Sequence, residues 1–274
     1  MVESFRPKTY EEVLEIISQK EVVIIAGGTD LMVKNRNWSS LPPLFKKDVL
    51  FLNAIEELKY IRKEADGLHI GSMTTLTTLL GHPDTPVLLK KAISLMASPA
   101  IRHSGTLGGN IGNASPAGDT LPVLYVLGAQ VVLESKVSIR IVPIETFIQG
   151  PGKKDLANNE VIKEIIIENA HFDHEVFEKV GGRKSDAISK NSFCGVANCS
   201  GTKLVHLRIA FGAVGPTVIR NREIEEKAVK GGDIAMVLHA YAKILKPIDD
   251  QRSSAIYRKQ CSLNLLEGFL KELK

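Results

Sequence analysis

The chain has 274 residues, of which 44% are hydrophobic and 24% charged, a composition typical of a globular protein with one large or two medium domains. Its 35 Lys and Arg residues against 31 Asp and Glu give a net charge of only +4, which argues against a nucleic-acid-binding surface and an acidic tail. The basic residues are scattered. Pairs such as Lys46–Lys47 and Lys153–Lys154 are therefore predicted to lie on solvated faces.

The sequence also lacks the patterns of a membrane or iron–sulfur protein. No apolar run reaches the length of a membrane span and the amino-terminal residues lack a signal-peptide pattern, so we expect a cytoplasmic protein. Cys194 and Cys199 have the first spacing of a plant-type iron–sulfur site, but the close third cysteine is missing. Together with Cys261, they are expected to be free, buried thiols.

The first part of the chain predicts short helices and strands in alternation. Thr9 is a candidate N-cap with Glu12 three residues later, and the helix that follows has one apolar side. The apolar run 22–26 predicts a buried strand, and the apolar patch after the next two glycines predicts a short helix or an irregular turn. Further along we expect strands at 49–55 and 67–73, a helix capped by Thr74 or Thr75, and a longer helix over 86–97.

The second part of the chain predicts more strands and then two helices, so the overall class is α+β. The segment 119–135 predicts a helix and then a strand, and 138–148 predicts a strand in which Pro143 is tolerated only near an end or an edge. Composition changes near residue 172, which we interpret as a domain boundary. Beyond it we expect strands on both sides of a glycine turn within 202–220, and helices over 234–245 and 257–273.

Two glycine-containing loops each follow apolar secondary structure, AGGTDL at 26–31 and TLGGNIGNASPAGD at 106–119. Glycine permits positive φ and lets a ligand approach backbone amides, and successive amides in such turns form an anion-binding nest. A cofactor that contains a pyrophosphate suits two such loops, one on each side. Neither loop has the G-x-G-x-x-G pattern of a dinucleotide fold or the G-K-[ST] end of a P-loop.

Side chains in these loops add hydrogen-bonding groups. Thr29, Thr106 and Asn110 would act as donors, and Asp119 could accept from ribityl or ribose hydroxyls. A single Gly-Gly turn after a strand is usually only a turn. Two such loops, one of them long and polar, favour a binding function.

The two motifs carry a resemblance to a known family. AGGTDLMV, followed later by IRHSGTLGGNIGNASPAGDTLPVLYVLGAQVVL, resembles the FAD-binding medium subunit of the molybdenum hydroxylases, which include xanthine dehydrogenase, aerobic carbon monoxide dehydrogenase and nicotinate dehydrogenase. The similarity covers nearly the whole chain. It implies an α+β fold with an FAD-binding domain of the vanillyl-alcohol oxidase (PCMH) type at 1–172, split into two subdomains near residue 56, and a smaller α+β domain at 173–274.

The resemblance also implies which residues contact FAD, and it implies no catalytic residue or metal ligand in this chain. Met96 stands where xanthine dehydrogenases have an aromatic residue, so its role is left open. Isoleucines among the implied contacts would be buried with or without a cofactor, and a lysine is more often on the surface. The implied FAD contacts are Ile24, Ile25, Ala26, Gly27, Gly28, Thr29, Asp30, Leu31, Thr106, Leu107, Gly108, Gly109, Asn110, Asp119, Ile162 and Lys179.

The family implies an oxidoreductase of three kinds of subunit. A molybdopterin-binding large subunit would hydroxylate a purine or another N-heterocycle, a two-iron two-sulfur small subunit would carry the electrons, and this flavoprotein subunit would pass them to NAD. The sequence leaves the acceptor open between NAD, a quinone and oxygen. Two alternatives also stay open: a stand-alone flavin oxidoreductase of the same fold, and a structural subunit that has lost FAD.

Overall fold

The computed structural model describes residues 2–184 and 186–273. By internal packing the chain forms two compact units: a first unit of residues 1–85, 98–114 and 129–168, and a second unit of residues 86–97, 115–128 and 169–274. The units are not continuous in sequence, because two short segments from the first half of the chain pack with its carboxyl-terminal part. No helix among the described residues has the length and apolar character to cross a membrane.

The first unit opens with a small parallel sheet. Its strands are β1 (Ser4–Phe5), β2 (Val23–Ile25) and β3 (Val49–Phe51), in the order β1-β3-β2. The helix α1 (Tyr10–Gln19) buries Val13 and Ile17 in the apolar cluster that contains Leu50. The predicted N-cap is confirmed, since the Thr9 hydroxyl accepts a hydrogen bond from the Glu12 amide at 3.2 Å.

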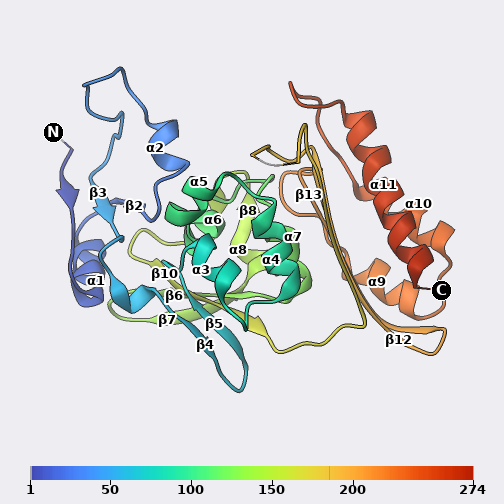
Figure 1. Ribbon diagram of the computed structural model, residues 1–274. Coiled ribbons are helices and arrows are strands. Elements are labelled where there is room, and N and C mark those ends of the chain that lie inside the picture. Colours follow the sequence, from blue (N-terminus) through green and yellow to red (C-terminus); the bar gives the residue numbers. More distant parts are fainter. Residues whose placement is uncertain (1, 185, 274) are drawn as a thin grey trace. The chain divides into compact units, whose positions relative to one another are not determined.

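The first unit also contains a five-stranded antiparallel sheet (Figure 1). Its strands, in the order β4-β5-β10-β6-β7, are β4 (Ile61–Lys63), β5 (Gly67–Gly71), β10 (Val161–Glu168), β6 (Gln130–Glu134) and β7 (Ile139–Pro143). Pro143 ends the edge strand β7, as the sequence predicts, because proline cannot donate to a ladder. A separate hairpin is formed by β8 (Ile148–Gly150) and β9 (Lys153–Lys154).

Short helices complete the first unit. They are α2 (Leu31–Lys34), α3 (Leu76–Gly81), α5 (Pro99–Ser104), α6 (Leu107–Asn113), α8 (Ile144–Phe147) and the 3-10 helix η1 (Glu56–Leu58). Of the two predicted caps for α3, the structure selects Thr75, whose hydroxyl accepts from the Thr78 amide at 3.1 Å. The first half of the second glycine motif, which the sequence analysis treated as a loop, forms the helix α6.

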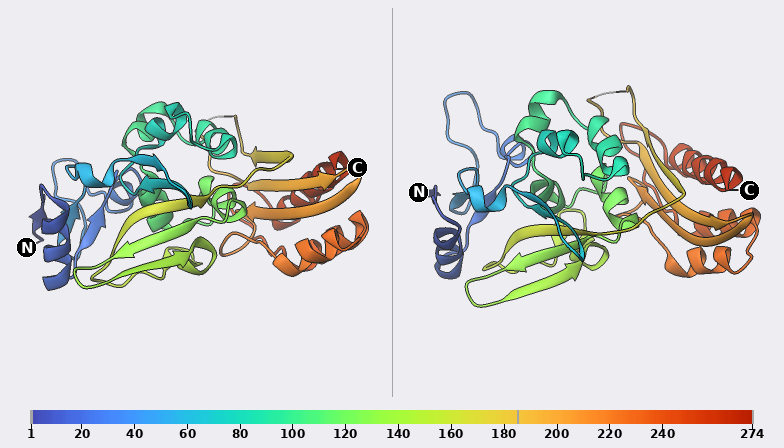
Figure 2. Two further views of the ribbon diagram at one scale, coloured as in Figure 1. Left: turned by 90° about the horizontal axis from the view of Figure 1, so that it is seen from below. Right: turned by 60° about the horizontal axis from the view of Figure 1, so that its bottom comes forward.

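The second unit contains a three-stranded antiparallel sheet flanked by helices (Figure 2). The strands are β11 (His174–Val180), β12 (Asn191–Ser200) and β13 (Lys203–Gly212). The helices are α4 (Val87–Ser94), α7 (Thr120–Val126), α9 (Arg222–Val229), α10 (Ile234–Ile244) and α11 (Ala255–Glu272). Aromatic rings link the sheet to α11: the Phe193 ring of β12 lies 5.7 Å from Phe269 of α11, and 5.2 Å from Phe211 on the neighbouring strand β13.

Two expectations for the second unit need correction. Only β13 is a strand in 202–220; beyond the glycine turn the chain makes a single bridge, between Phe211 and Ile219, and then enters α9. The three cysteines are free thiols, but only Cys194 is buried, whereas Cys199 and Cys261 are partly exposed. Cys194 lies near the middle of the central strand β12, whereas Cys199 lies near its exposed end and Cys261 on α11.

Candidate functional site

The first glycine loop forms a tight turn between β2 and α2. Gly28 has a φ of +69°, in the left-handed region that favours glycine. The amides of Gly27, Gly28 and Thr29 donate to no other group among the described residues. The residues from Ala26 to Thr29 are partly exposed to solvent. Successive uncommitted amides around a positive φ make a turn that can bind an anion.

The second glycine loop uses its amides internally. At the start of α6, the Leu107 amide donates to the Thr74 carbonyl at 3.2 Å and the Gly108 amide to the Ser72 carbonyl at 3.1 Å. The Thr106 hydroxyl accepts from the Gly109 amide at 3.0 Å as the N-cap. The prediction that this loop forms a second anion-binding amide nest was therefore wrong, because its amides already donate hydrogen bonds to carbonyl and hydroxyl groups of the protein.

The two loops lie against each other within the first unit. A β-carbon built on Gly27 would stand 1.9 Å from the Ser104 carbonyl oxygen, so these backbones are in direct contact. A β-carbon on Gly109 would stand 3.3 Å from the Ala26 β-carbon. Residues about eighty positions apart thus meet through their backbones, an approach that only glycine allows.

An apolar layer supports the loops. Ile25, Leu107 and Ile162 are buried, and Ile24 is half-buried beside the cluster around α1. A β-carbon on Gly112 of α6 would stand 3.5 Å from the Cδ1 atom of Ile162, so α6 packs closely on β10. Of the three isoleucines among the implied contacts, Ile25 and Ile162 are thus core residues, whereas Ile24 is only half-buried.

Two lysines lie beside the loops, and the sequence analysis did not identify them as site residues. The Lys34 ammonium is 2.5 Å from a carboxylate oxygen of Asp30 and donates to the Asn113 side-chain oxygen at 2.8 Å. Lys154 is partly buried, and burial together with the nearby Lys34 charge lowers its pKa. The Gly152 amide of the same hairpin donates to the Ala114 carbonyl after α6, at 3.0 Å.

Lys154 therefore corrects the expectation that the pair 153–154 is solvated. Only Lys153 is exposed. No carboxylate among the described residues pairs with the Lys154 ammonium, so its charge is available to an anion. One sequence feature could have pointed to Lys154: the lysine pair comes directly after a Gly-Pro-Gly turn.

Asp119 and Lys179, both implied FAD contacts, belong to the second unit and form a buried ion pair. The Lys179 ammonium donates to a carboxylate oxygen of Asp119 at 2.7 Å and to the Leu95 carbonyl at 2.9 Å. The Ser189 hydroxyl donates to the other Asp119 oxygen. Both charged side chains are nearly inaccessible, with 4% exposed for Lys179 and 6% for Asp119. Burial raises the pKa of Asp119, and Lys179 and Ser189 oppose this rise.

Comparison with known families covers almost all of the chain. Residues 1–169 match the family of FAD binding domains in molybdopterin dehydrogenase, and residues 176–273 match the CO dehydrogenase flavoprotein C-terminal domain. The predicted fold class is thereby confirmed: an α+β FAD-binding domain followed by the carboxyl-terminal domain of these flavoproteins.

Individual relatives agree with this assignment. The FAD-subunit of nicotinate dehydrogenase from Eubacterium barkeri is 40% identical over 200 residues, a match that covers 68% of this chain and 65% of that subunit, just under two thirds of its length. A putative xanthine dehydrogenase FAD-binding subunit from Escherichia coli is 28% identical, over 98% of this chain and 93% of the relative.

A solved structure extends the similarity to three dimensions. A carbon monoxide dehydrogenase from Hydrogenophaga pseudoflava contains a chain of 28% identity that superposes with a TM-score of 0.88, over 98% of this chain and 96% of that one. Sequence and fold therefore agree over nearly the full length. The chain belongs to the FAD-binding medium subunits of the molybdenum hydroxylases, the family of xanthine dehydrogenase and carbon monoxide dehydrogenase, and is an oxidoreductase subunit.

Proposed function

We propose that the first glycine loop, against which α6 packs, holds the diphosphate of FAD. The single observation that carries this proposal is the turn at 27–29, whose three amides are uncommitted around a positive φ at Gly28. The Lys34 and Lys154 ammonium groups supply positive charge beside it. These residues fit a doubly charged anion, whereas an ordinary turn needs neither open amides nor an unpaired lysine.

The other implied contacts stay predictions. Thr29, Asp30 and Leu31 would line the diphosphate and ribityl region, and Asn110 would add a polar side chain. Asp119 and Lys179 would contact the cofactor through the hydrogen-bonding capacity that their own pairing leaves. Because that pair is already satisfied within the second unit, we expect it to stabilise the protein in addition to any role at the flavin.

We further propose that the chain works in a complex with a molybdopterin-binding large subunit and a two-iron two-sulfur small subunit. It would receive electrons from the iron–sulfur clusters of the small subunit and deliver them to NAD, during hydroxylation of a purine or another N-heterocycle. FAD, when bound, supplies the ability to take up electrons singly and to release them as a pair. Relatives named for nicotinate, xanthine and caffeine support the N-heterocycle.

The full-length chain can test both parts of this proposal. It should be mixed with FAD, freed of unbound cofactor, and its visible spectrum recorded before and after addition of NADH. A retained flavin spectrum that bleaches with NADH is expected. Retention without bleaching would overturn NAD as acceptor but not FAD binding. A folded chain that retains no flavin, alone or with its partner subunits, would contradict the proposal that the chain binds FAD.

A further inference from the structure

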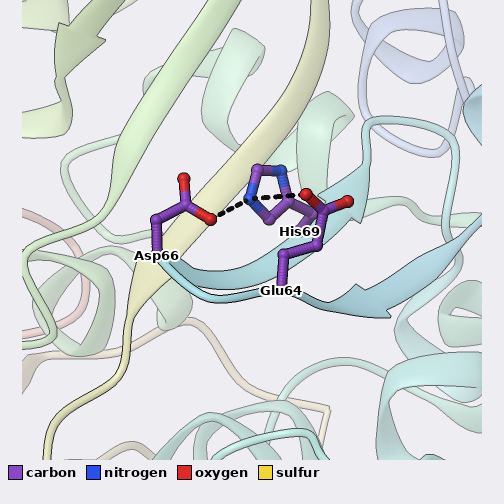
Figure 3. Close-up of side chains that lie close together, drawn as sticks. All are labelled: Glu64, Asp66 and His69. Atoms are coloured by element: carbon purple, nitrogen blue, oxygen red, sulfur yellow. Dashed lines mark hydrogen bonds and ion pairs between the residues drawn. The ribbon is translucent and has the colours of Figure 1, made fainter.

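The turn between β4 and β5 gathers three side chains that can bind a metal. Glu64, Asp66 and His69 each offer one ligand atom, and these atoms lie within 4.8 Å of one another (Figure 3). The Nε2 atom of His69 is 3.0 Å from a carboxylate oxygen of Asp66 and 3.9 Å from one of Glu64. The group therefore combines one imidazole nitrogen with two carboxylates.

The imidazole is held in place from its other side. The His69 side chain is only 10% exposed, and its Nδ1 atom is 3.2 Å from a carboxylate oxygen of Glu164 on the neighbouring strand β10. That same oxygen accepts a hydrogen bond from the Tyr60 hydroxyl at 2.6 Å. A carboxylate on the second ring nitrogen is how proteins orient metal-binding histidines and raise their basicity. The arrangement leaves Nε2 directed toward Glu64 and Asp66.

The local charge also favours a cation. Three carboxylates, from Glu64, Asp66 and Glu164, surround one imidazole. Arg62 pairs with His69 in the strand register and stacks its guanidinium over the Tyr60 ring at 4.4 Å, which places one positive charge near these carboxylates.

We propose that Glu64, Asp66 and His69 bind one divalent transition-metal ion of the Zn²⁺ type, with water in the remaining positions. Such an ion sits about 2.0–2.2 Å from its ligands, so ligand atoms lie about 3–4 Å apart. The His69 Nε2 atom lies 3.9 Å from the Glu64 oxygen and 3.0 Å from the Asp66 oxygen, within this range. The nitrogen ligand selects against Mg²⁺ and Ca²⁺, which prefer oxygen alone. The turn before β5 is closed by a hydrogen bond from the Glu64 amide to the Gly67 carbonyl at 2.8 Å. An ion bound here would further link this turn to β5.

The test uses the full-length chain, freed of metal with a chelator. Calorimetric titration with Zn²⁺ should show one ion bound per chain at micromolar affinity, and Co²⁺ should give a visible absorption band. His69→Gln should weaken binding at least 100-fold, and Asp66→Asn about tenfold. Because the Asp66 side chain is 67% exposed, the second variant is expected to fold even if the first does not.

Two further variants separate this site from general histidine binding. Glu164→Gln should lower Zn²⁺ affinity about 10- to 100-fold and change the Co²⁺ band, which loss of packing alone would not do. His171→Gln is the matched control: its side chain is 91% exposed, 4.0 Å from Asp173, and should bind as the wild type does. FAD affinity, measured on the same samples, should stay unchanged. Binding no tighter than millimolar in the wild type, or binding that survives His69→Gln and Asp66→Asn, would overturn the proposal.

Discussion

Gly27 and Ser104 join the two glycine loops through their backbones: a β-carbon on Gly27 would stand 1.9 Å from the Ser104 carbonyl oxygen. No side chain can enter this contact without moving one of the loops. The turn that follows Gly27 carries the uncommitted amides, and Ser104 ends the helix just before α6. The glycine therefore serves to set the spacing of the proposed cofactor site.

Gly27→Ala is expected to force the loops apart. Inserting a methyl group into a close backbone contact destabilises a protein by about 1–3 kcal/mol. FAD affinity should fall with the change in loop spacing, which equilibrium titration of the flavin spectrum can measure. Gly81→Ala is the control, since a β-carbon there has nothing within 4 Å and alanine favours the end of α3. Equal FAD affinity in both variants would contradict the assigned role of this contact.

Lys154→Gln is expected to weaken FAD binding roughly tenfold, about 1.4 kcal/mol, because it removes a positive charge from the proposed diphosphate site. Lys153→Gln, on the exposed neighbouring residue, should leave the affinity close to that of the wild type. The difference between the two variants should shrink at high salt, since screening weakens charge–charge attraction. Identical affinities in low salt would remove Lys154 from the site.

The Asp119–Lys179 pair should matter for stability whether or not FAD is present. Lys179→Met leaves a buried carboxylate without its partner, and breaking such a pair costs about 3–5 kcal/mol. Asp119→Asn should show a comparable loss, and the double variant should lose less than the sum of the two. Urea unfolding of the three variants, with flavin removed, measures these values. Additive losses would show that the two charges do not depend on each other.

The same pair gives a pH prediction. Lys179→Met removes the charge that opposes the rise in the pKa of Asp119, so this pKa should rise further above its unfolded value. A carboxyl group with a raised pKa favours the folded state while protonated. The variant should therefore lose stability as pH rises through the raised pKa, and unfolding measured at several pH values between 4 and 8 can detect this. A flat profile would contradict it.

Asp250 should give the opposite dependence of stability on pH. A hydrogen bond from the Arg252 amide, with others from the Arg258 guanidinium and the Ser253 amide, lowers its pKa to about 2. Its contribution to stability is present above the ordinary range near 3.9 and is lost as pH falls toward 2. Asp250→Asn should thus be less stable than the wild type at neutral pH, with a difference in melting temperature that narrows below about pH 4. A constant difference down to pH 2 would contradict this account.

Local features of the fold could be predicted from the sequence. Thr9 and Thr75 cap helices because a cap depends only on residues within one turn. α6 could not be predicted, since glycine has a low helix propensity and the helix depends on carbonyls of Ser72 and Thr74 from another segment. Tertiary hydrogen bonds here override the local preference.

In the candidate site too, some features could be predicted from local sequence and others depend on tertiary contacts. The glycine motif around Gly27 identified one loop directly, because close backbone approach leaves a mark in the sequence. The partly buried Lys154 lies near the charge of Lys34, about 120 positions earlier in the sequence, and the pairing of Asp119 with Lys179 joins residues 60 positions apart. Neither relationship has a local pattern, so both needed the three-dimensional structure.

The most direct test of the central claim is the FAD dissociation constant of the full-length chain, measured by titration of its visible spectrum at low salt for the wild type, Gly27→Ala and Lys154→Gln. The account predicts one FAD per chain in the wild type and weaker binding in both variants, each still folded. A folded wild type that binds FAD with the same affinity as both variants would contradict the assignment of the cofactor to these loops.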